Sequence, residues 1–510
     1  MRITDLLPPV NVKRNEVPHL MKWLGNEQEV IILGSGLGGL VAGTLLSKNN
    51  RSVLLLKEKG YQSSYSTKGY HFVPFSNLSE KCLKPSLVRR VSRALNLSLL
   101  MGTREDGKQA KAAPDRSRQR ASFQVILPKA RIDIFRDRLL LQREWKREFP
   151  EEALRIEGFY KELDQIQQLL QKVKGEKNTS PFFPFRQRRF LTKMFSSDPL
   201  PKEGVDEKLS AFPREFREFI RLQLISRGNF YSDRFPLSLA TQVLFDGVNE
   251  SNSDFDSERL ETEILNQFVR SGGRIVEIEG VKEVSFGWRK EFTLTPEGSH
   301  AVFRSRFLIM NCPLRRISSF LGKKGKGISK WEKKIKPLYV LIPLFVGIDE
   351  KVIPVGMKDL LVSVLDPEKR YSDGNVLFLS LSSKGDRTRA PEGKRALTVE
   401  SLMEVEKWGQ TNLADHQQGV MNHLHSLFPF LERFTELVDF QWTSDHVSRW
   451  SYPHFLYEPC SDFYWREGMV PIKMAKKICF VGKENFPYLG LGGEVFSGMI
   501  AGQHILKQYS

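Results

Sequence analysis

Apolar and polar positions follow one another in blocks along the chain, and residues 29–58 form the most regular set. An apolar run at 30–33 is followed by a glycine cluster, an apolar helix-like segment at 40–46, a polar turn and an apolar run at 53–56. This order predicts a strand, a tight turn, a helix and a second strand within about 30 residues. It is the size expected of a dinucleotide-binding βαβ unit.

The glycines of this unit have separate predicted roles. Gly34 lets the strand turn tightly, Gly36 lets the backbone approach a pyrophosphate, and Gly39 lets the helix pack close to the strand. The helix N-terminus would offer N–H groups and a partial positive charge to the phosphates. An ordinary βαβ unit with a glycine-rich turn is the alternative. We predict a nucleotide site formed by Gly34, Gly36, Leu37, Gly38 and Gly39.

The end of the second strand departs from the usual pattern. An acidic residue commonly stands there and binds the ribose, whereas this chain has Lys57, with Glu58 one position later. Successive strand side chains point to opposite faces, so the two residues face different surroundings. Either Glu58 reaches the ribose through a twist of the strand end, or Lys57 meets a phosphate as in NADP-binding proteins. A third possibility is that both are solvated and the adenosine is held by backbone alone.

The rest of the chain alternates between helical and strand-like patterns. Helical spacing of apolar residues is found at 137–173, 212–225, 257–271 and 402–428. Strand-like runs are found at 275–284, 301–313, 338–348, 359–365, 376–382 and from 395. The chain closes at 476–506 with an apolar strand, a glycine-rich turn and a helix predicted to begin near Glu494. The closing segment therefore repeats the order of the opening one.

Composition adds a basic surface to this picture. The 510 residues include 78 Lys+Arg against 60 Asp+Glu, and the net charge of +18 favours anionic partners. No nucleic-acid-binding module is recognisable, so we expect no nucleic acid and favour an anionic membrane surface over a basic protein without such a partner. Residues 181–195 and 323–336 combine aromatic and cationic side chains, which suits headgroup contact, although a helical lid or a solvated face also fits.

Cysteine spacing and hydropathy bear on metal chemistry and location. The four cysteines are scattered without a CxxC pair, which argues against a zinc site and a disulfide framework. The first residues lack the apolar segment of a signal peptide, and no charge-free apolar run outside the glycine-rich unit is long enough to span a bilayer. We therefore expect a cytoplasmic protein, peripheral on the inner membrane face if it binds a membrane.

Both ends of the chain together resemble the FAD-dependent amine oxidase and phytoene desaturase superfamily, and the match is closer to the phytoene desaturase-like branch. Beside the opening glycines, four segments carry the resemblance. They are LPKARIDIFRD with EFPEE, SGGRIVEIEGVKEV, DRTRAPEGKRALTV and FVGKENFPYLGLGGEVFSGMIAG. The resemblance spans nearly the whole chain, and the first and last features are the specific ones.

The resemblance implies an α/β fold in which a Rossmann-like (GR2-type) FAD-binding domain is interleaved with an α+β substrate or cap domain. The FAD-binding domain would comprise residues 28–100, 251–320 and 456–510, and the substrate domain 122–250 and 321–455. Val281 would hold the adenine through its backbone, while Gly482 and Glu484 would lie by the ribityl chain and pyrophosphate. A helix N-terminus at the flavin would be formed by Gly492, Gly493, Glu494 and Val495.

By the same resemblance, the protein would exchange hydride between FAD and an apolar, isoprenoid or carotenoid-like small molecule. Desaturation, saturation and isomerisation stay open, as do the catalytic residues and the oligomeric state. His71, His446 and His454 are candidate proton carriers because histidine titrates near neutral pH, although each is more often an ordinary core or surface residue.

Two alternatives to this function remain. One is an NADP-dependent oxidoreductase that uses Lys57. The other is a protein of flavoprotein fold that binds a lipid or a partner without redox turnover. The second alternative draws support from Lys57 and from Ser63 and Ser64, which stand where many flavoproteins have a second glycine pair.

Overall fold

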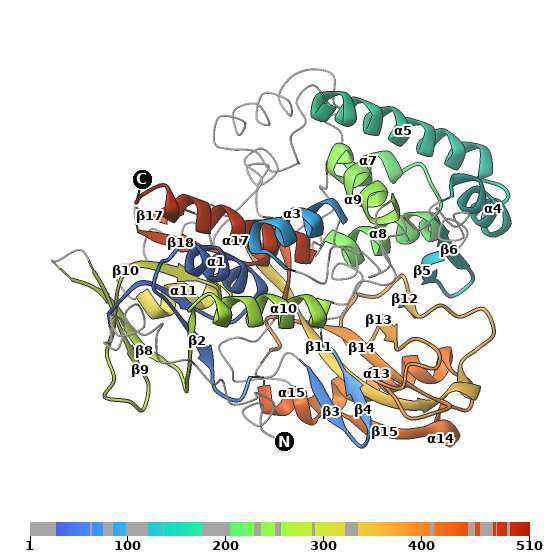
Figure 1. Cartoon of the computed structure of the whole chain (residues 1–510). Coiled ribbons are helices and arrows are strands. Elements are labelled where there is room, and N and C mark those ends of the chain that lie inside the picture. Colours follow the sequence, from blue (N-terminus) through green and yellow to red (C-terminus); the bar gives the residue numbers. More distant parts are fainter. Residues whose placement is uncertain are drawn as a thin grey trace, which may run out of the picture.

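Two eight-stranded sheets organise the computed structural model of this chain (Figure 1). Each sheet takes its strands from several separate stretches of sequence, so the two halves of the fold are interleaved along the chain. The stretch 181–195, most of 323–336 and Ser63 lie outside the described residues. The structure describes residues 27–61, 64–74, 85–97, 121–135, 137–175, 204–228, 236–249, 257–287, 291–321, 335–408, 413–446, 454–459, 473–475, 477–486 and 490–509.

The first sheet is parallel at its centre and contains the opening βαβ unit. Its order is β17-β18-β10-β1-β2-β7, with β9 paired to β10 and β8 to β9. One face of β1 packs on helices and the other on the main core, which explains why the strand is apolar at every position from 30 to 33. The strands are β1 (Glu27–Leu33), β2 (Val53–Glu58), β7 (Arg274–Ile278), β8 (Val281–Phe286), β9 (Phe292–Pro296), β10 (Phe303–Met310), β17 (Lys473–Ala475) and β18 (Ile478–Phe480).

Helices from both ends of the chain pack together on this sheet. α1 (Leu37–Lys48) lies between α17 (Gly490–Leu506) and α10 (Ser257–Arg270), with α3 (Pro85–Leu95) beside it (Figure 1). α1 and α17 approach so closely that a Cβ atom on Gly498 would lie 2.2 Å from the carbonyl oxygen of Gly38. The prediction that α17 begins near Glu494 is wrong by about one turn. Packing against α1 keeps residues 490–493 helical despite the low helix propensity of glycine.

The second sheet is mainly antiparallel and lies beside the first. Its order is β15-β11-β14-β13-β12-β5-β6, with β16 paired to β11. That pairing places residues 455–459 in the second sheet, although the predicted boundary between the two domains falls at 456. The strands are β5 (Ala121–Ile126), β6 (Arg131–Phe135), β11 (Ile335–Asp349), β12 (Leu360–Val364), β13 (Val376–Leu381), β14 (Lys394–Glu404), β15 (Thr435–Asp439) and β16 (Phe455–Pro459).

Smaller elements cover the two sheets and their junction. A hairpin of β3 (Tyr65–Thr67) and β4 (Tyr70–Phe72) packs on β11, where the Tyr70 ring occupies the space that a side chain at Gly347 would fill. A short helix, η6 (Lys483–Asn485), follows β18 and precedes α17. The remaining elements of this group are α11 (Leu314–Leu321), η5 (Glu350–Val352), α13 (Leu413–Leu427), α14 (Leu431–Phe434) and α15 (Gln441–His446).

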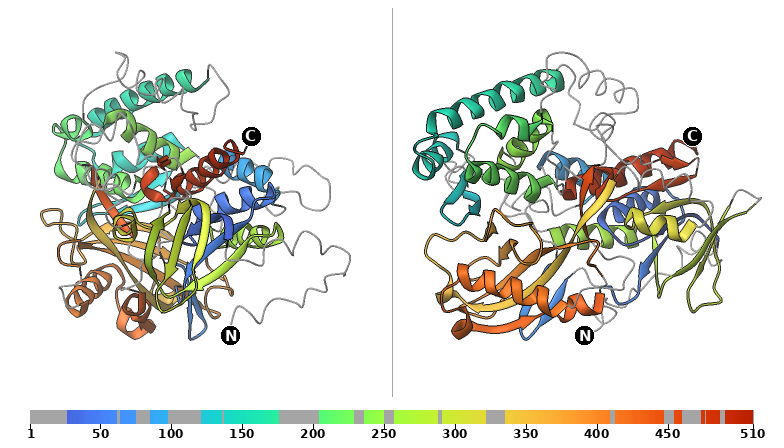
Figure 2. Two further views of the ribbon diagram at one scale, coloured as in Figure 1. Left: turned by 90° about the vertical axis from the view of Figure 1, so that its left-hand side faces the viewer. Right: turned by 180° about the vertical axis from the view of Figure 1, so that it is seen from behind.

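A group of helices stands above the second sheet and forms the cap (Figure 2). Its core is aromatic: the rings of Trp145 and Tyr160 stack with centroids 4.4 Å apart, and Phe216 contacts four other phenylalanines. Within the described residues, no helix is both long enough and apolar enough to cross a membrane. The cap helices are α4 (Arg138–Glu148), α5 (Ala153–Gly175), α7 (Val205–Leu209), α8 (Arg214–Gly228) and α9 (Leu237–Asn249).

A buried histidine on α13 makes the stability of the second sheet depend on pH. His416 is 2% exposed, its Nε2 lies 2.7 Å from Ser401 Oγ, and burial lowers its pKa to about 4. Between that pH and the ordinary value of about 6.5, the unfolded chain binds more protons than the folded one. The contribution of neutral His416 to the free energy of unfolding is therefore fully present above about pH 6.5. About 3 kcal/mol of it is lost as the pH falls toward 4.

Urea unfolding at a series of pH values measures this loss. His416→Gln is expected to be less stable than the wild type at neutral pH but to lose less stability on acidification. The remaining slope would come from groups such as His423, whose pKa burial also lowers. If the free energy of unfolding changed equally with pH in the wild type and in His416→Gln, His416 would not be the source of the pH dependence.

Candidate functional site

The carboxyl ends of β1, β10 and β18 meet at one edge of the first sheet, which is where parallel sheets commonly bind ligands. Gly34 directly follows β1 and has φ of +105°, so the tight turn predicted there is present. The N–H of Asn311, just after β10, donates to the Leu33 carbonyl at 2.8 Å, and the N–H of Val481 donates to Met310 at 2.9 Å. These bonds bring the opening and closing segments of the chain to the same edge.

Asn311 fastens the three strand ends together, and its role was not predicted from the sequence. Its side-chain oxygen accepts the Gly39 N–H at 2.9 Å, and its Nδ2 donates to the Val481 carbonyl at 3.0 Å. The residue is 8% exposed. A polar residue directly after the apolar strand 307–310 was the available signal, but nothing local indicates which backbone groups it bonds.

Glu494 approaches the same helix end from the other side. It is 7% exposed, and its Oε1 accepts the Gly38 N–H at 3.2 Å. A Cβ atom on Gly36 would lie 2.7 Å from both this oxygen and Asn311 Oδ1. The missing side chain of Gly36 therefore makes room for Asn311 and Glu494, while the approach of a pyrophosphate to its backbone stays a prediction.

Two N–H groups at the start of α1, those of its N-cap residue Gly36 and of Leu37, remain available to a ligand. The first N–H groups of a helix have no partner within the helix. Glu494 and Asn311 bond those of Gly38 and Gly39, whereas no hydrogen bond within the described chain reaches those of Gly36 and Leu37. We call residues 34–39, Asn311, residues 481–484 and Glu494 the cradle. Its open donors can bind an anionic group such as a phosphate.

The closing segment contributes a turn and a buried carboxylate to the cradle. Gly482 is extended, and its N–H donates to Ser497 Oγ at 3.2 Å. Glu484 accepts the Leu314 N–H at 3.2 Å and the hydroxyl of Tyr457, which lies on β16 of the second sheet. Burial raises the pKa of Glu484. Gly492, Gly493, Glu494 and Val495 lie within the first two turns of α17 rather than at its first residue.

The structure distinguishes Lys57 from Glu58. Glu58 is 2% exposed at the carboxyl end of β2, level with Ile278 of β7. The neighbouring Lys59 N–H donates to the Ile278 carbonyl at 2.8 Å, and Val281 begins the next strand. Lys57 instead places Nζ 3.7 Å from Glu277 Oε1, where it is partly exposed. Glu58 and Val281 therefore share one corner of the sheet edge, while Lys57 pairs with a carboxylate.

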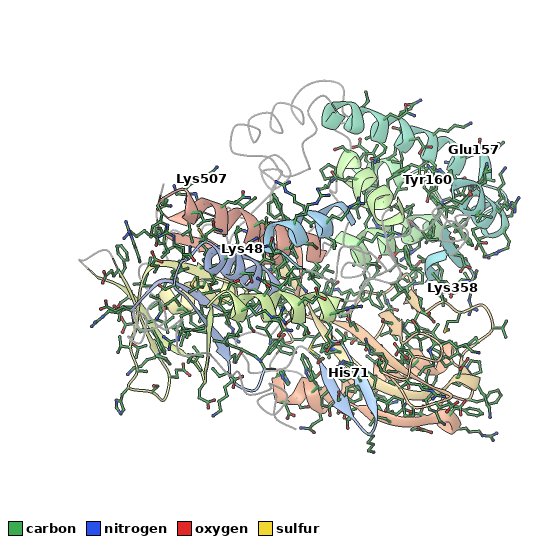
Figure 3. All side chains as sticks on the ribbon, in the orientation of Figure 1. Lys48, His71, Glu157, Tyr160, Lys358 and Lys507 are labelled. Carbon is green, nitrogen blue, oxygen red and sulfur yellow. The ribbon has the colours of Figure 1, made fainter. Side chains whose placement is uncertain are left out.

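The three candidate histidines lie in different surroundings. His71 is on β4, away from α1, and its Nε2 is 2.9 Å from Glu258 (Figure 3). His446 is buried against Trp442, with ring centroids 4.2 Å apart. His454 Nδ1 is 3.1 Å from Lys483 Nζ, so the His454 side chain is bonded to the cradle. Burial, followed by the charge of Lys483, lowers its pKa well below the usual range, which favours a neutral ring at pH 7.

Sequence comparison finds distant relatives. No family model matches the chain. It is 24% identical over 401 residues to the chloroplastic prolycopene isomerase of Arabidopsis thaliana, and 24% identical over 418 residues to that of Daucus carota. The matches cover 74% and 77% of this chain, and the chain spans only 64% of the length of each relative.

Solved structures with the same architecture decide the fold. Cyclohexylamine oxidase from Brevibacterium oxydans superposes with a TM-score of 0.58 over 94% of this chain and 99% of its own, at 14% identity. A double mutant of putrescine oxidase gives 0.59 over 94% and 99%, at 12% identity. The chain has the amine oxidase fold. The predicted α/β fold class is confirmed, and with the isomerase matches so is the resemblance to the desaturase-like branch of this superfamily.

Proposed function

We propose that the protein is an FAD-dependent oxidoreductase of the amine oxidase and carotenoid desaturase or isomerase type. The observation that carries the proposal is the cradle, in which α1, the closing turn and α17 meet across Asn311. The open N–H groups of Gly36 and Leu37 suit the pyrophosphate of FAD, and the buried Glu58 suits its ribose hydroxyls. When bound, the flavin supplies hydride exchange with a carbon atom of the substrate.

We further propose an apolar, isoprenoid or carotenoid-like substrate. Support comes from the name prolycopene isomerase of the two matched relatives and from the main core cluster. That cluster runs from Leu33 and Met310 at the first sheet to Phe345 of β11 and Phe219 of α8. An apolar junction between sheet and cap excludes water and orients a hydrocarbon against the cofactor.

A visible absorption spectrum of the purified protein tests the proposal. We expect the two absorption bands of oxidised flavin, either as purified or after reconstitution with FAD. A colourless protein that FAD does not reconstitute would favour the second candidate function, a protein of this fold that binds a lipid or partner without redox turnover. The contact of Glu494 with the N-terminus of α1 is the observation that favours this candidate, because a carboxylate already bonds one of the phosphate-binding N–H groups.

Glu58 and Lys57 provide a matched pair of variants that separates FAD from NADP. Glu58→Gln is expected to weaken FAD binding about tenfold or more, because a hydrogen bond to a charged group contributes about 1.5–3 kcal/mol. Lys57→Ala is expected to change FAD binding less than twofold, since Lys57 pairs with Glu277. Flavin fluorescence titration measures both. If NADPH stabilised the wild type but not Lys57→Ala, this would contradict the assignment of FAD as the cofactor. It would support the hypothesis of an NADP-dependent oxidoreductase that uses Lys57.

We also propose that the protein contacts an anionic membrane surface. The net charge of +18 supports contact with an anionic membrane surface. A cytoplasmic protein that is peripheral on the inner face of a membrane would meet such a surface. Binding of the protein to vesicles with and without anionic lipid tests this directly.

A further inference from the structure

We infer that the Glu494 carboxylate competes with the cofactor diphosphate for the N-terminus of α1, and thereby limits the affinity of the site for FAD. The inference rests on the proposed FAD function. Glu494 belongs to α17 and lies 456 residues from Gly38, whose N–H its Oε1 accepts at 3.2 Å. It thus connects two elements that the dinucleotide would also connect.

The glycines of α1 hold this side chain directly over the helix end. A Cβ atom on Gly36 would lie 2.7 Å from Glu494 Oε1, and one on Gly38 would lie 3.2 Å from Glu494 Cγ. Any larger residue at either position would displace the glutamate. The same absence of side chains that suits a phosphate therefore admits a carboxylate of the protein itself.

The charge of Glu494 is balanced by the helix and not by a cation. Within the described part of the chain, no basic side chain lies within ion-pair distance of it. A negative group at a helix N-terminus is stabilised by the helix dipole, so the contact suits the protein without cofactor. A second carboxylate, Glu484, lies nearby. Its pKa is raised first by burial, and repulsion from Glu494 adds to this effect.

A bound diphosphate brings further negative charge to this helix end. Like charges a few ångströms apart repel strongly in a buried site, where water screens them poorly. The phosphates must then bind beside this charge, or the glutamate must turn away. Either step costs binding free energy, so removing the charge of Glu494 should increase the affinity for FAD.

Three variants test this by FAD titration of the full-length protein, followed by flavin fluorescence. Glu494→Gln keeps an oxygen that can accept the Gly38 N–H but removes the charge, and Glu494→Ala removes both. Glu144→Gln is the matched control, because Glu144 is also buried and accepts a backbone N–H, that of Asp133 at 3.0 Å, in the cap. We expect both Glu494 variants to bind FAD at least about tenfold more tightly, which corresponds to about 1.4 kcal/mol.

A second readout is the thermal stability of the protein without FAD. Glu494→Ala should melt at a lower temperature than the wild type because the helix end loses its cap. The melting temperature of Glu494→Gln should fall by less. The two readouts together separate the capping contact from the competition. The control should leave FAD affinity within twofold of the wild type.

The outcomes distinguish the inference from the proposed function. If the wild type binds FAD and both Glu494 variants bind it equally or more weakly, the inference fails and the proposed function stands. If only the Glu494 variants bind FAD, the inference is supported and the proposed function fails for the natural chain. If none of the proteins binds FAD, both fail.

Discussion

Replacing Gly34 with alanine is expected to lower the free energy of unfolding by about 3 kcal/mol or more and to abolish FAD binding. The backbone at this position has φ of +105°, which residues with a side chain rarely adopt. The new Cβ atom would also lie 1.9 Å from the carbonyl oxygen of Asn311. The strand end must therefore move, and the turn that aims α1 at the cradle moves with it. Urea unfolding and FAD titration measure the two effects.

Gly272→Ala serves as the matched control. Gly272 has a similar φ of +88°, but a Cβ atom there would meet nothing within 4 Å. Its substitution should therefore cost only the backbone strain, about 1–2 kcal/mol, and leave FAD affinity unchanged. If the two substitutions cost the same, the close approach of Asn311 to Gly34 would not be what makes glycine necessary.

Asn311→Ala is expected to lower the free energy of unfolding by about 2–4 kcal/mol and to weaken FAD binding. The substitution leaves the Gly39 N–H and the Val481 carbonyl without their bonds to the asparagine. A buried polar group without a partner costs about 1–3 kcal/mol. Asn311→Asp keeps an acceptor for Gly39 but cannot donate to Val481, and it adds a negative charge to the cradle. Its FAD affinity should therefore be lower than that of Asn311→Ala.

Asn375→Ala separates loss of stability from loss of binding. Asn375 is also buried, and its side chain bonds four backbone groups, those of Asp366, Lys369 and Arg370, but it lies directly before β13 of the second sheet. Asn375→Ala should lower the free energy of unfolding by about as much as Asn311→Ala does, without changing FAD affinity. Equal FAD affinity in Asn311→Ala and Asn375→Ala would show that Asn311 is only a structural residue.

The sequence predicted the parts of the site that are local in the chain. The strand, turn and helix at 27–48 follow from apolar periodicity and glycine spacing, because both act over a few residues. The contacts that close the cradle join residues 272 and 456 positions apart, at Asn311 and Glu494, and no local pattern specifies them. Periodicity also could not choose between Lys57 and Glu58, since that choice depends on Glu277 of the neighbouring strand.

The start of α17 shows how packing overrides propensity. The run of glycines before Glu494 predicts a turn, because glycine is a poor helix former in isolation. In the structure these residues are helical and buried, and the helix they begin packs against α1. The sequence contains the glycines that make this packing possible, but it does not show which surface they meet.

The position of β18 has a consequence for the synthesis of the protein. β10 pairs with β1 on one side and with β18 on the other, and α17 then covers α1. The first sheet therefore stays incomplete until residues beyond 478 have been translated, on the order of tens of seconds after the βαβ unit leaves the ribosome. Between the translation of β10 and that of β18, the edge of β10 has unpaired backbone groups, which could pair with the strands of other chains.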